Sequence, residues 1–332
     1  MGFKYVSIGY FLMQDRILLV TGDRAEYDLL KPVADALLKT EKFEVGFFVA
    51  GTHQLDKFGN TINQIKNDGF KIVAKISNLL HSDLPSSRAK SLGIELSSLV
   101  DTIDNYEPMM VVVLGDREET LAAATACVYS QVICIHLCGG DSTADGNSDN
   151  SIRDAVSKMA NVHFPTTEKS KNRIINMGED PWRVFNYGAT GLDTLADLKI
   201  IPKGKVFQSL GISKEINDYA VLIQHPILSD LKNSLLDLES SLNALLDFGI
   251  PTFIGRPNSD PGNIVLHDLL DQYCEQNENL LTEMINYVDE RHSKLLDLKK
   301  DQISYEIDSI KSEIFYLKES MIVALKYKIL KL

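Results

Sequence analysis

Residues 109–128 read MMVVVLGDREETLAAATACV, and this stretch decides the fold. A continuous run of Met, Val and Leu ends at Gly115, charged residues follow, and an alanine-rich segment comes next. A short apolar run of this kind is typical of a buried strand, and the segment after it is typical of a helix. The stretch therefore predicts a strand over Met109–Leu114, a charged loop, and a helix over Thr120–Val128.

The same pattern recurs on both sides of this stretch, and each time glycine follows the apolar run. Further strands are predicted at Arg16–Thr21, Val45–Ala50 and Val132–Leu137, with a helix over Tyr27–Leu38. Strands of continuous Val, Ile and Leu that alternate with helices indicate an α/β fold with a parallel sheet covered on both faces. Ligands bind such sheets at the carboxyl ends of the strands. The glycine-rich and charged segments fall at those ends.

A second α/β unit is predicted from strands at Ala220–Ile223 and Pro251–Ile254, separated by a helix over Leu231–Leu246. We expect an N-terminal domain over residues 1–187, a partial second domain over 188–276 and a helical tail over 277–332. Neither Gly nor Pro occurs from Asn263 to Leu332, and apolar residues from Ile303 to Ala324 alternate at spacings of four and three. This stripe predicts a long amphipathic helix, which either packs on its own domain or mediates self-association.

The composition excludes several classes of function. The 332 residues carry a formal charge of −12, so no broad positive field is present to hold nucleic acid or a membrane surface. No apolar run approaches the roughly 20 residues that span a bilayer, and we expect a cytoplasmic protein. The four cysteines show no spacing typical of zinc sites or disulfides, so no metal is expected. Both the dinucleotide glycine fingerprint and the phosphate loop are missing, and no cofactor is predicted.

Charged residues placed just after the predicted strands are the candidates for chemistry. They are Arg24, Asp116, Glu118, Asp141, Asp149 and Arg153. Arginine forks bind phosphate oxygens, and carboxylates exchange protons or hold sugar hydroxyls. Alternatives remain open for single residues: Asp149 is also placed to cap its helix or pair with Arg153, and Asp116 is also placed to accept backbone amides. Their joint position favours a site for an anionic ligand.

Six separated motifs carry a resemblance to a known family. They are TGDRAEYDLLKP (21–32), AGTHQLDKFGNTINQI (50–65), LGDREETLAAATA (114–126), HLCGGDSTADGNSDNSIRDAVSKMANVHFPTTE (136–168), NRIINMGEDPWRVFNYGATGLD (172–193) and QHP (224–226). In order and spacing they resemble the UDP-N-acetylglucosamine 2-epimerases, particularly the hydrolysing branch that serves sialic-type acid pathways. The resemblance runs from about Arg16 to about Tyr273.

The resemblance implies two Rossmann-like domains of glycosyltransferase-B type, with a UDP-sugar between them. It also implies a reaction without metal or nicotinamide, in which loss of the C2 proton and departure of UDP give a 2-acetamidoglucal that water then rehydrates as the epimer. By matching motif, Asp116, Asp149 and His225 are candidate catalytic residues. Arg24, His53, Glu118, Asp141 and Arg153 are candidate substrate-binding residues. Taken alone, His225 is also consistent with a structural histidine.

The sequence departs from the family pattern at several places. Asp23 stands where the family usually has Ser or Thr, Cys138 stands where some relatives have a catalytic glutamate, and Asn150 replaces an acidic residue. Beyond about Gln276 the family's UDP-binding loop and arginine segment are not found, so we expect an incomplete second domain. A non-catalytic homologue that assembles through its tail, as a possible homo-oligomer, is the alternative function. Met13 is an alternative start, with Met1–Leu12 as an extension.

Overall fold

The computed structural model describes residues 14–80, 85–143, 148–197, 202–209, 212, 216–227, 230–258, 260, 262–277 and 280–282. The predictions for Met1–Leu12, for Met13 and for the stripe from Ile303 to Ala324 lie outside these residues.

The first unit is a six-stranded sheet in the order β3-β2-β1-β4-β5-β6, and all its described strand pairs are parallel. Its strands are β1 (Asp15–Thr21), β2 (Phe43–Val49), β3 (Lys71–Lys75), β4 (Met110–Leu114), β5 (Ile133–Leu137) and β6 (Val162–Phe164). Its helices are α1 (Arg24–Leu38), α2 (Ile62–Asn67), α3 (Pro85–Tyr106), α4 (Glu118–Ser130), α5 (Asp149–Met159) and α6 (Glu168–Asn176), with short 3-10 turns η1 (Gly51–Gln54), η2 (Asp56–Phe58) and η3 (Pro181–Arg183). The predicted α/β fold with a parallel sheet is confirmed.

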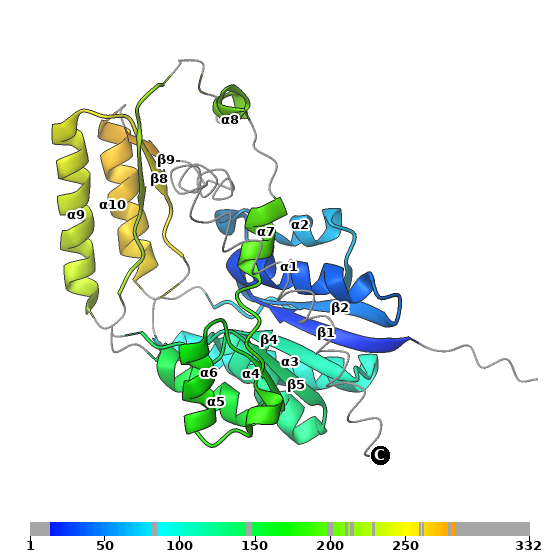
Figure 1. Ribbon diagram of the computed structural model, residues 1–332. Coiled ribbons are helices and arrows are strands. Elements are labelled where there is room, and N and C mark those ends of the chain that lie inside the picture. Colours follow the sequence, from blue (N-terminus) through cyan, green and yellow to red (C-terminus); the bar gives the residue numbers. More distant parts are fainter. Residues whose placement is uncertain are drawn as a thin grey trace, which may run out of the picture.

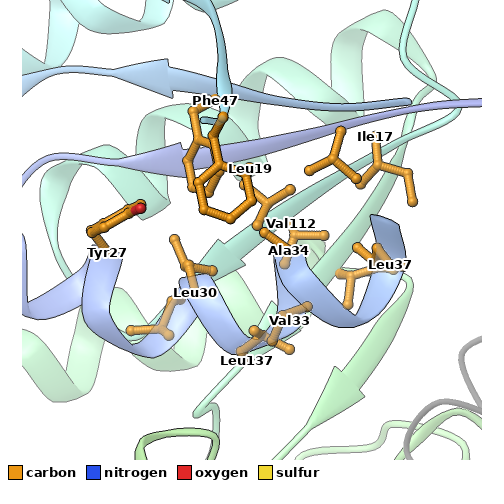
Figure 2. Packing of buried hydrophobic residues seen from close by; sticks show 14 of the residues in the cluster. Ile17, Leu19, Tyr27, Leu30, Val33, Ala34, Leu37, Phe47, Val112 and Leu137 are labelled. Carbon is orange, nitrogen blue, oxygen red and sulfur yellow. The ribbon is translucent and has the colours of Figure 1, made fainter. Parts of the chain in front are cut away.

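Alternate residues of each strand enter two separate cores, because successive side chains of a strand point to opposite faces. Ile17 and Leu19 of β1 pack with α1, whereas Leu18 and Val20 pack with α3 and α4. Figure 2 shows the first core, where Leu30 and Leu37 of α1 lie against the strands. Both faces of the sheet are therefore covered, which explains why its strands are continuously apolar.

The second unit contains the parallel strands β7 (Ala220–Ile223), β8 (Thr252–Gly255) and β9 (Leu280–Thr282), in that order. Its helices are α9 (Leu231–Phe248) and α10 (Asn263–Gln276), while α7 (Gly191–Asp197) and α8 (Lys203–Ser209) lie in the segment between the two units. Figure 1 shows α9 and α10 beside β8 and β9, apart from the first sheet. Leu242 of α9 and Leu266 of α10 form its core with Ile254.

One sequence prediction is corrected here. The sequence predicts a helical tail over residues 277–332, whereas α10 ends at Gln276 and Leu280–Thr282 forms a strand that pairs with β8. The helical tail therefore does not start at residue 277. Three residues can add to a sheet edge without any glycine or proline to signal the change, because the backbone pairing with β8 is a contact distant along the chain that no local pattern marks.

Candidate functional site

The loops after β1 and β4 meet at the switch point of the first sheet. These strands are neighbours, yet the chain proceeds from β1 toward β3 on one side and from β4 toward β6 on the other. Such a point opens a crevice at the carboxyl ends of the strands. The Arg117 Nη1 atom lies 3.1 Å from the Asp23 Oδ2 atom and joins the two loops. The sheet order thus places Arg24 and Asp116, which follow β1 and β4, at one edge of the sheet.

Asp116 and Arg153 form an ion pair in this crevice. Asp116 follows β4, and Arg153 reaches it from the second turn of α5. The Arg153 Nη1 atom also donates to the carbonyl oxygen of Asp141 and to the Asn150 Oδ1 atom, both at 3.1 Å. Arg153 is buried, whereas the Asp116 side chain keeps 22% of its surface exposed. A fixed guanidinium therefore orients a carboxylate that solvent and ligands can reach.

Asp141 contacts Arg153 of this ion pair, and Asp149 begins the helix that carries Arg153. The Asp141 Oδ1 atom accepts a hydrogen bond from the Ser170 hydroxyl at 2.5 Å, and its backbone carbonyl holds Arg153. Asp149 is the first residue of α5, where free amides and the helix dipole favour a carboxylate. The structure brings Asp116, Asp141, Asp149 and Arg153 to the carboxyl end of the sheet.

Three other predicted site residues are held by protein groups. His53 is fully buried between the Thr21 and Thr61 hydroxyls, at 2.9 and 2.8 Å. Burial lowers the pKa of His53 to about 4, against the raising effect of Asp23, so the ring is neutral. Glu118 is bound by both the Nε and Nη2 atoms of Arg88. Arg24 begins α1 and pairs with Asp28 at 3.8 Å.

His225 lies on the second unit, directly after β7. Its Nδ1 atom accepts a hydrogen bond from the backbone N–H of Asn258 at 3.1 Å. The segment around it is tied to α9, because the Ser234 hydroxyl accepts from the N–H of Ile227 and the Ser234 carbonyl accepts from the Gln224 side chain. Burial lowers the pKa of His225, although the charge of Asp260 opposes this shift. The sequence did not identify Asn258 or Asp260.

A buried acidic layer of Glu26, Glu95 and Glu119 lies under the crevice loops, and the sequence analysis missed it. The Glu26 carboxylate accepts from the N–H of Gly22 at 2.5 Å, and the Asn78 amide donates to Glu95 at 2.9 Å. A Cβ atom on Gly22 would lie 1.8 Å from a Glu119 carboxylate oxygen, so only glycine fits there. Glu119, Ala122, Ala123 and Ala126 share helical spacing on the buried face of α4, and this spacing was the available signal.

Burial and mutual repulsion raise the pKa values of the acidic layer. Burial is the largest cause for each member, followed by the charge of a neighbouring carboxylate. The pKa of Glu119 rises to about 7 and that of Glu95 to about 10, while that of Glu26 is raised well above its usual range. Protons therefore remain on part of this layer near neutral pH.

His136 supports the loop that carries Asp116. Its Nε2 atom lies 2.8 Å from the carbonyl oxygen of Gly115, which only accepts, so Nε2 carries the proton. Its Nδ1 atom then accepts from the Ser157 hydroxyl at 3.2 Å. Burial lowers the pKa of His136 to about 4 despite the bond to Gly115, and the ring remains neutral.

The departures from the family pattern have physical consequences in the structure. Asp23 accepts from the N–H of Glu26 at 3.0 Å as the N-cap of α1, and its charge is balanced by Arg117. Burial and the charge of Asp141 raise the pKa of the Cys138 thiol to about 12, so Cys138 is poorly suited to acid–base chemistry. Asn150 exchanges hydrogen bonds with the backbone of Thr143 and also accepts from Arg153.

Two parallel α/β units, with charged loops at the carboxyl ends of their strands, define the class of two-domain glycosyltransferase-B-type folds. The family model for UDP-N-acetylglucosamine 2-epimerase matches residues 35–294. The chain belongs to this family.

Two relatives with assigned names match most of the chain. The hydrolysing UDP-N,N'-diacetylbacillosamine 2-epimerase of Legionella pneumophila is 34% identical over 260 residues, which cover 78% of this chain and 68% of the relative. The hydrolysing GDP/UDP-N,N'-diacetylbacillosamine 2-epimerase of Campylobacter jejuni is 28% identical over 302 residues, which cover 91% of this chain and 78% of the relative.

Solved structures share the fold. The UDP-GlcNAc 2-epimerase of Neisseria meningitidis, bound to UDP-GlcNAc, aligns with a TM-score of 0.65 at 20% identity, over 80% of this chain and 71% of that chain. The enzyme of Methanocaldococcus jannaschii, in complex with UDP-GlcNAc and UDP, aligns with a TM-score of 0.67 at 19% identity, over 83% and 75%. The predicted glycosyltransferase-B-type architecture is confirmed.

Proposed function

We propose that this protein is a hydrolysing 2-epimerase, which converts a UDP-2-acetamido sugar and water into UDP and the free sugar epimerised at C2. Family membership supports this proposal, as do relatives named as hydrolysing 2-epimerases. The observation that carries it is the ion pair of Asp116 with Arg153 at the switch point, because it places an oriented, accessible carboxylate where the sugar would lie. UDP-N-acetylglucosamine and UDP-N,N'-diacetylbacillosamine are the candidate substrates.

The reaction needs two proton transfers at sugar C2 and a stabilised leaving group at C1. Removal of the C2 proton together with breakage of the bond from C1 to the diphosphate oxygen gives a 2-acetamidoglucal and UDP. Water then adds its hydroxyl at C1, and a proton returns to C2 on the opposite face. We propose Asp116 and Asp149 for these proton transfers, since both lie at the carboxyl end of the sheet beside Arg153.

Cationic and hydrogen-bonding groups must stabilise the departing diphosphate. We propose that Arg24, at the N-terminus of α1, and His225 contact the diphosphate or the sugar. We propose that Asp141 and Arg153 hold the sugar. His53 and Glu118 are enclosed by protein groups, so we propose that they act on the ligand through the loops they support.

Turnover with each candidate substrate tests the function. The purified chain is incubated with each UDP-sugar in deuterated water, and NMR follows UDP release and the C2 position of the sugar. Release of UDP together with a C2-deuterated epimer is the expected result. Folded protein that releases no UDP from either sugar would contradict the proposal.

We also propose a cytoplasmic, homo-oligomeric enzyme. The structure pairs none of Cys127, Cys134, Cys138 and Cys274 in a disulfide, which fits a reducing compartment, and closed symmetric association is the commonest form of soluble oligomers. Among the described helices, none is long and apolar enough to cross a bilayer. Light scattering on the purified chain measures the oligomeric state. A monomeric mass at the concentration used for the activity assay would contradict the proposed homo-oligomer.

A further inference from the structure

A polar chain connects the loop after β4 in the first unit to His225 in the second unit. The Arg117 Nη1 atom lies 3.8 Å from the Asp260 Oδ1 atom, across the two units. The Asn258 side-chain amide donates to the Asp260 Oδ2 atom at 2.7 Å. The backbone N–H of Asn258 donates to the His225 Nδ1 atom at 3.1 Å. One connected set of contacts therefore runs from the residue next to Asp116 to the candidate histidine.

The contact at Nδ1 determines the protonation of His225. A backbone N–H can only donate, so the Nδ1 atom must accept and carries no proton. A neutral imidazole has a single N–H, which then lies on Nε2. Protonation of Nδ1 would place its N–H against the backbone N–H of Asn258, and two donors cannot form a hydrogen bond. The loop after β8 thus keeps the ring in one tautomer, with Nε2 available as a hydrogen-bond donor.

The ion pair explains how that loop is held. Arg117 also contacts Asp23 at 3.1 Å and Glu119 at 3.8 Å, so its guanidinium is fixed within the first unit. Asp260 joins the same guanidinium from the second unit, and only 26% of its side-chain surface is exposed. A charge-assisted contact to a fixed partner is stronger and more directional than one to a mobile surface lysine.

We propose that Asn258 and Asp260 are positioning residues, which fix the Nε2–H tautomer of His225 and align it with the Asp116 loop through Arg117. This inference rests on the proposed function and deepens it: His225 acts as a neutral donor to an anionic or hydroxyl oxygen of the sugar nucleotide, and does not act as the base that removes the C2 proton. The loop after β8 contacts the first unit through the ion pair of Asp260 with Arg117.

The side-chain nitrogen signals of His225 test the tautomer directly, without substrate. The full chain is labelled with ¹⁵N, its histidine side-chain spectrum is recorded at neutral pH, and the His225 signals are assigned from their loss in His225→Gln. We expect an unprotonated Nδ1 and a protonated Nε2. In Asp260→Ala we expect both tautomers, and in Asp260→Asn a smaller change, because an amide oxygen can still accept from Asn258.

Kinetics supply the second measurement. With the substrate that the wild type turns over, Asp260→Ala lowers kcat by about ten- to a hundredfold, the loss expected for a charged hydrogen-bonding partner, and changes KM less. The matched control is Asp271→Asn on α10, which removes an ion pair with Arg256 inside the second unit. It leaves both the tautomer and kcat at wild-type values.

Four outcomes separate the hypotheses. A protonated Nδ1 in the wild type overturns the inference, as does a folded Asp260→Ala variant that keeps a single tautomer and the wild-type kcat. Equal losses in Asp260→Ala and Asp271→Asn also overturn it, because they indicate general loosening of the second unit. If the wild type releases UDP from neither sugar, the proposed function fails, while the spectrum still decides the tautomer.

Discussion

Replacing Glu119 by Gln should make the protein more stable at alkaline pH and leave it almost unchanged at acid pH. The Glu119 side chain is 5% exposed and lies between Arg117 and the backbone of Gly22. Gln has nearly the same shape but no charge. The variant therefore tests whether the carboxylate charge in the acidic layer is a net cost to the folded state.

The sign follows from the direction of the pKa shift. Burial and the charge of Glu118 raise the pKa of Glu119 from 4.5 to about 7, against the opposing charge of Arg117. Below pH 4.5 the carboxyl is protonated in both the folded and unfolded states. Between pH 4.5 and 7 the unfolded state loses this proton first, so stability falls as pH rises. The full shift corresponds to about 3 kcal/mol, reached above pH 7.

Urea unfolding at pH 5 and pH 8 measures this effect. We expect Glu119→Gln to exceed the wild type by less than about 1 kcal/mol at pH 5 and by about 3 kcal/mol at pH 8, where its melting temperature rises by roughly 5–10 °C. Protein concentration is kept low, because pH 5 lies near the pI of about 5.1.

Glu118→Gln is the matched control, because removing its charge should lower the stability of the folded state. Burial alone would raise the pKa of Glu118, but its hydrogen bonds and charge contact with Arg88 lower it. Its ionised form thus stabilises the folded state above pH 4.5, and this contribution is lost as pH falls through the lowered folded-state pKa. The control should be destabilised at both pH values. The reasoning is refuted if the stability difference between Glu119→Gln and the wild type is the same at pH 5 and pH 8. It is also refuted if the variant is less stable than the wild type at pH 8.

Further variants test the site and its scaffold. Asp116→Asn and Asp149→Asn should each abolish UDP release while circular dichroism stays native, and wild-type rates in both would remove these carboxylates from the mechanism. Arg153→Lys keeps the charge but loses the planar fork that joins Asp116 to α5, so we expect kcat to fall by about tenfold or more at an unchanged melting temperature. Gly140→Ala places a Cβ atom 2.3 Å from the carbonyl oxygen of Ser170 at a φ of +78°, and thermal unfolding should show a loss of about 1–3 kcal/mol; an unchanged melting temperature contradicts the close packing.

The strands of the first sheet could be predicted because both of their faces are buried. The prediction Met109–Leu114 differs from β4 by one residue, and Val45–Ala50 overlaps β2, which starts two residues earlier. Continuous apolar runs that end at glycine mark such strands, because neither face of the strand needs polar residues. They also placed the charged loops at one edge of the sheet, so the position of the crevice was accessible from the sequence.

The partners of the site residues could not be predicted, because contacts distant along the chain decide them. Glu118 and Glu119 are adjacent in the sequence, yet the helix turns one toward Arg88 of α3 and the other toward Gly22. Asp260 lies far along the chain from Arg117 and meets it only after the second unit docks. Spacing within one helix gave a signal for the burial of Glu119, whereas no local pattern marks the contact with Asp260.

The formal charge of −12 is compatible with an anionic ligand because the crevice charges are compensated locally. Arg117 balances Asp23, and Arg153 balances Asp116. Charges elsewhere on the surface are screened over about 8 Å at physiological salt, so they contribute little to the potential inside the crevice. We propose that a small sugar diphosphate binds near Arg24 at the start of α1, where the helix dipole and the loop set the local potential. A long polyanion would also meet the acidic surface, so the net charge disfavours nucleic acid and still permits a nucleotide sugar.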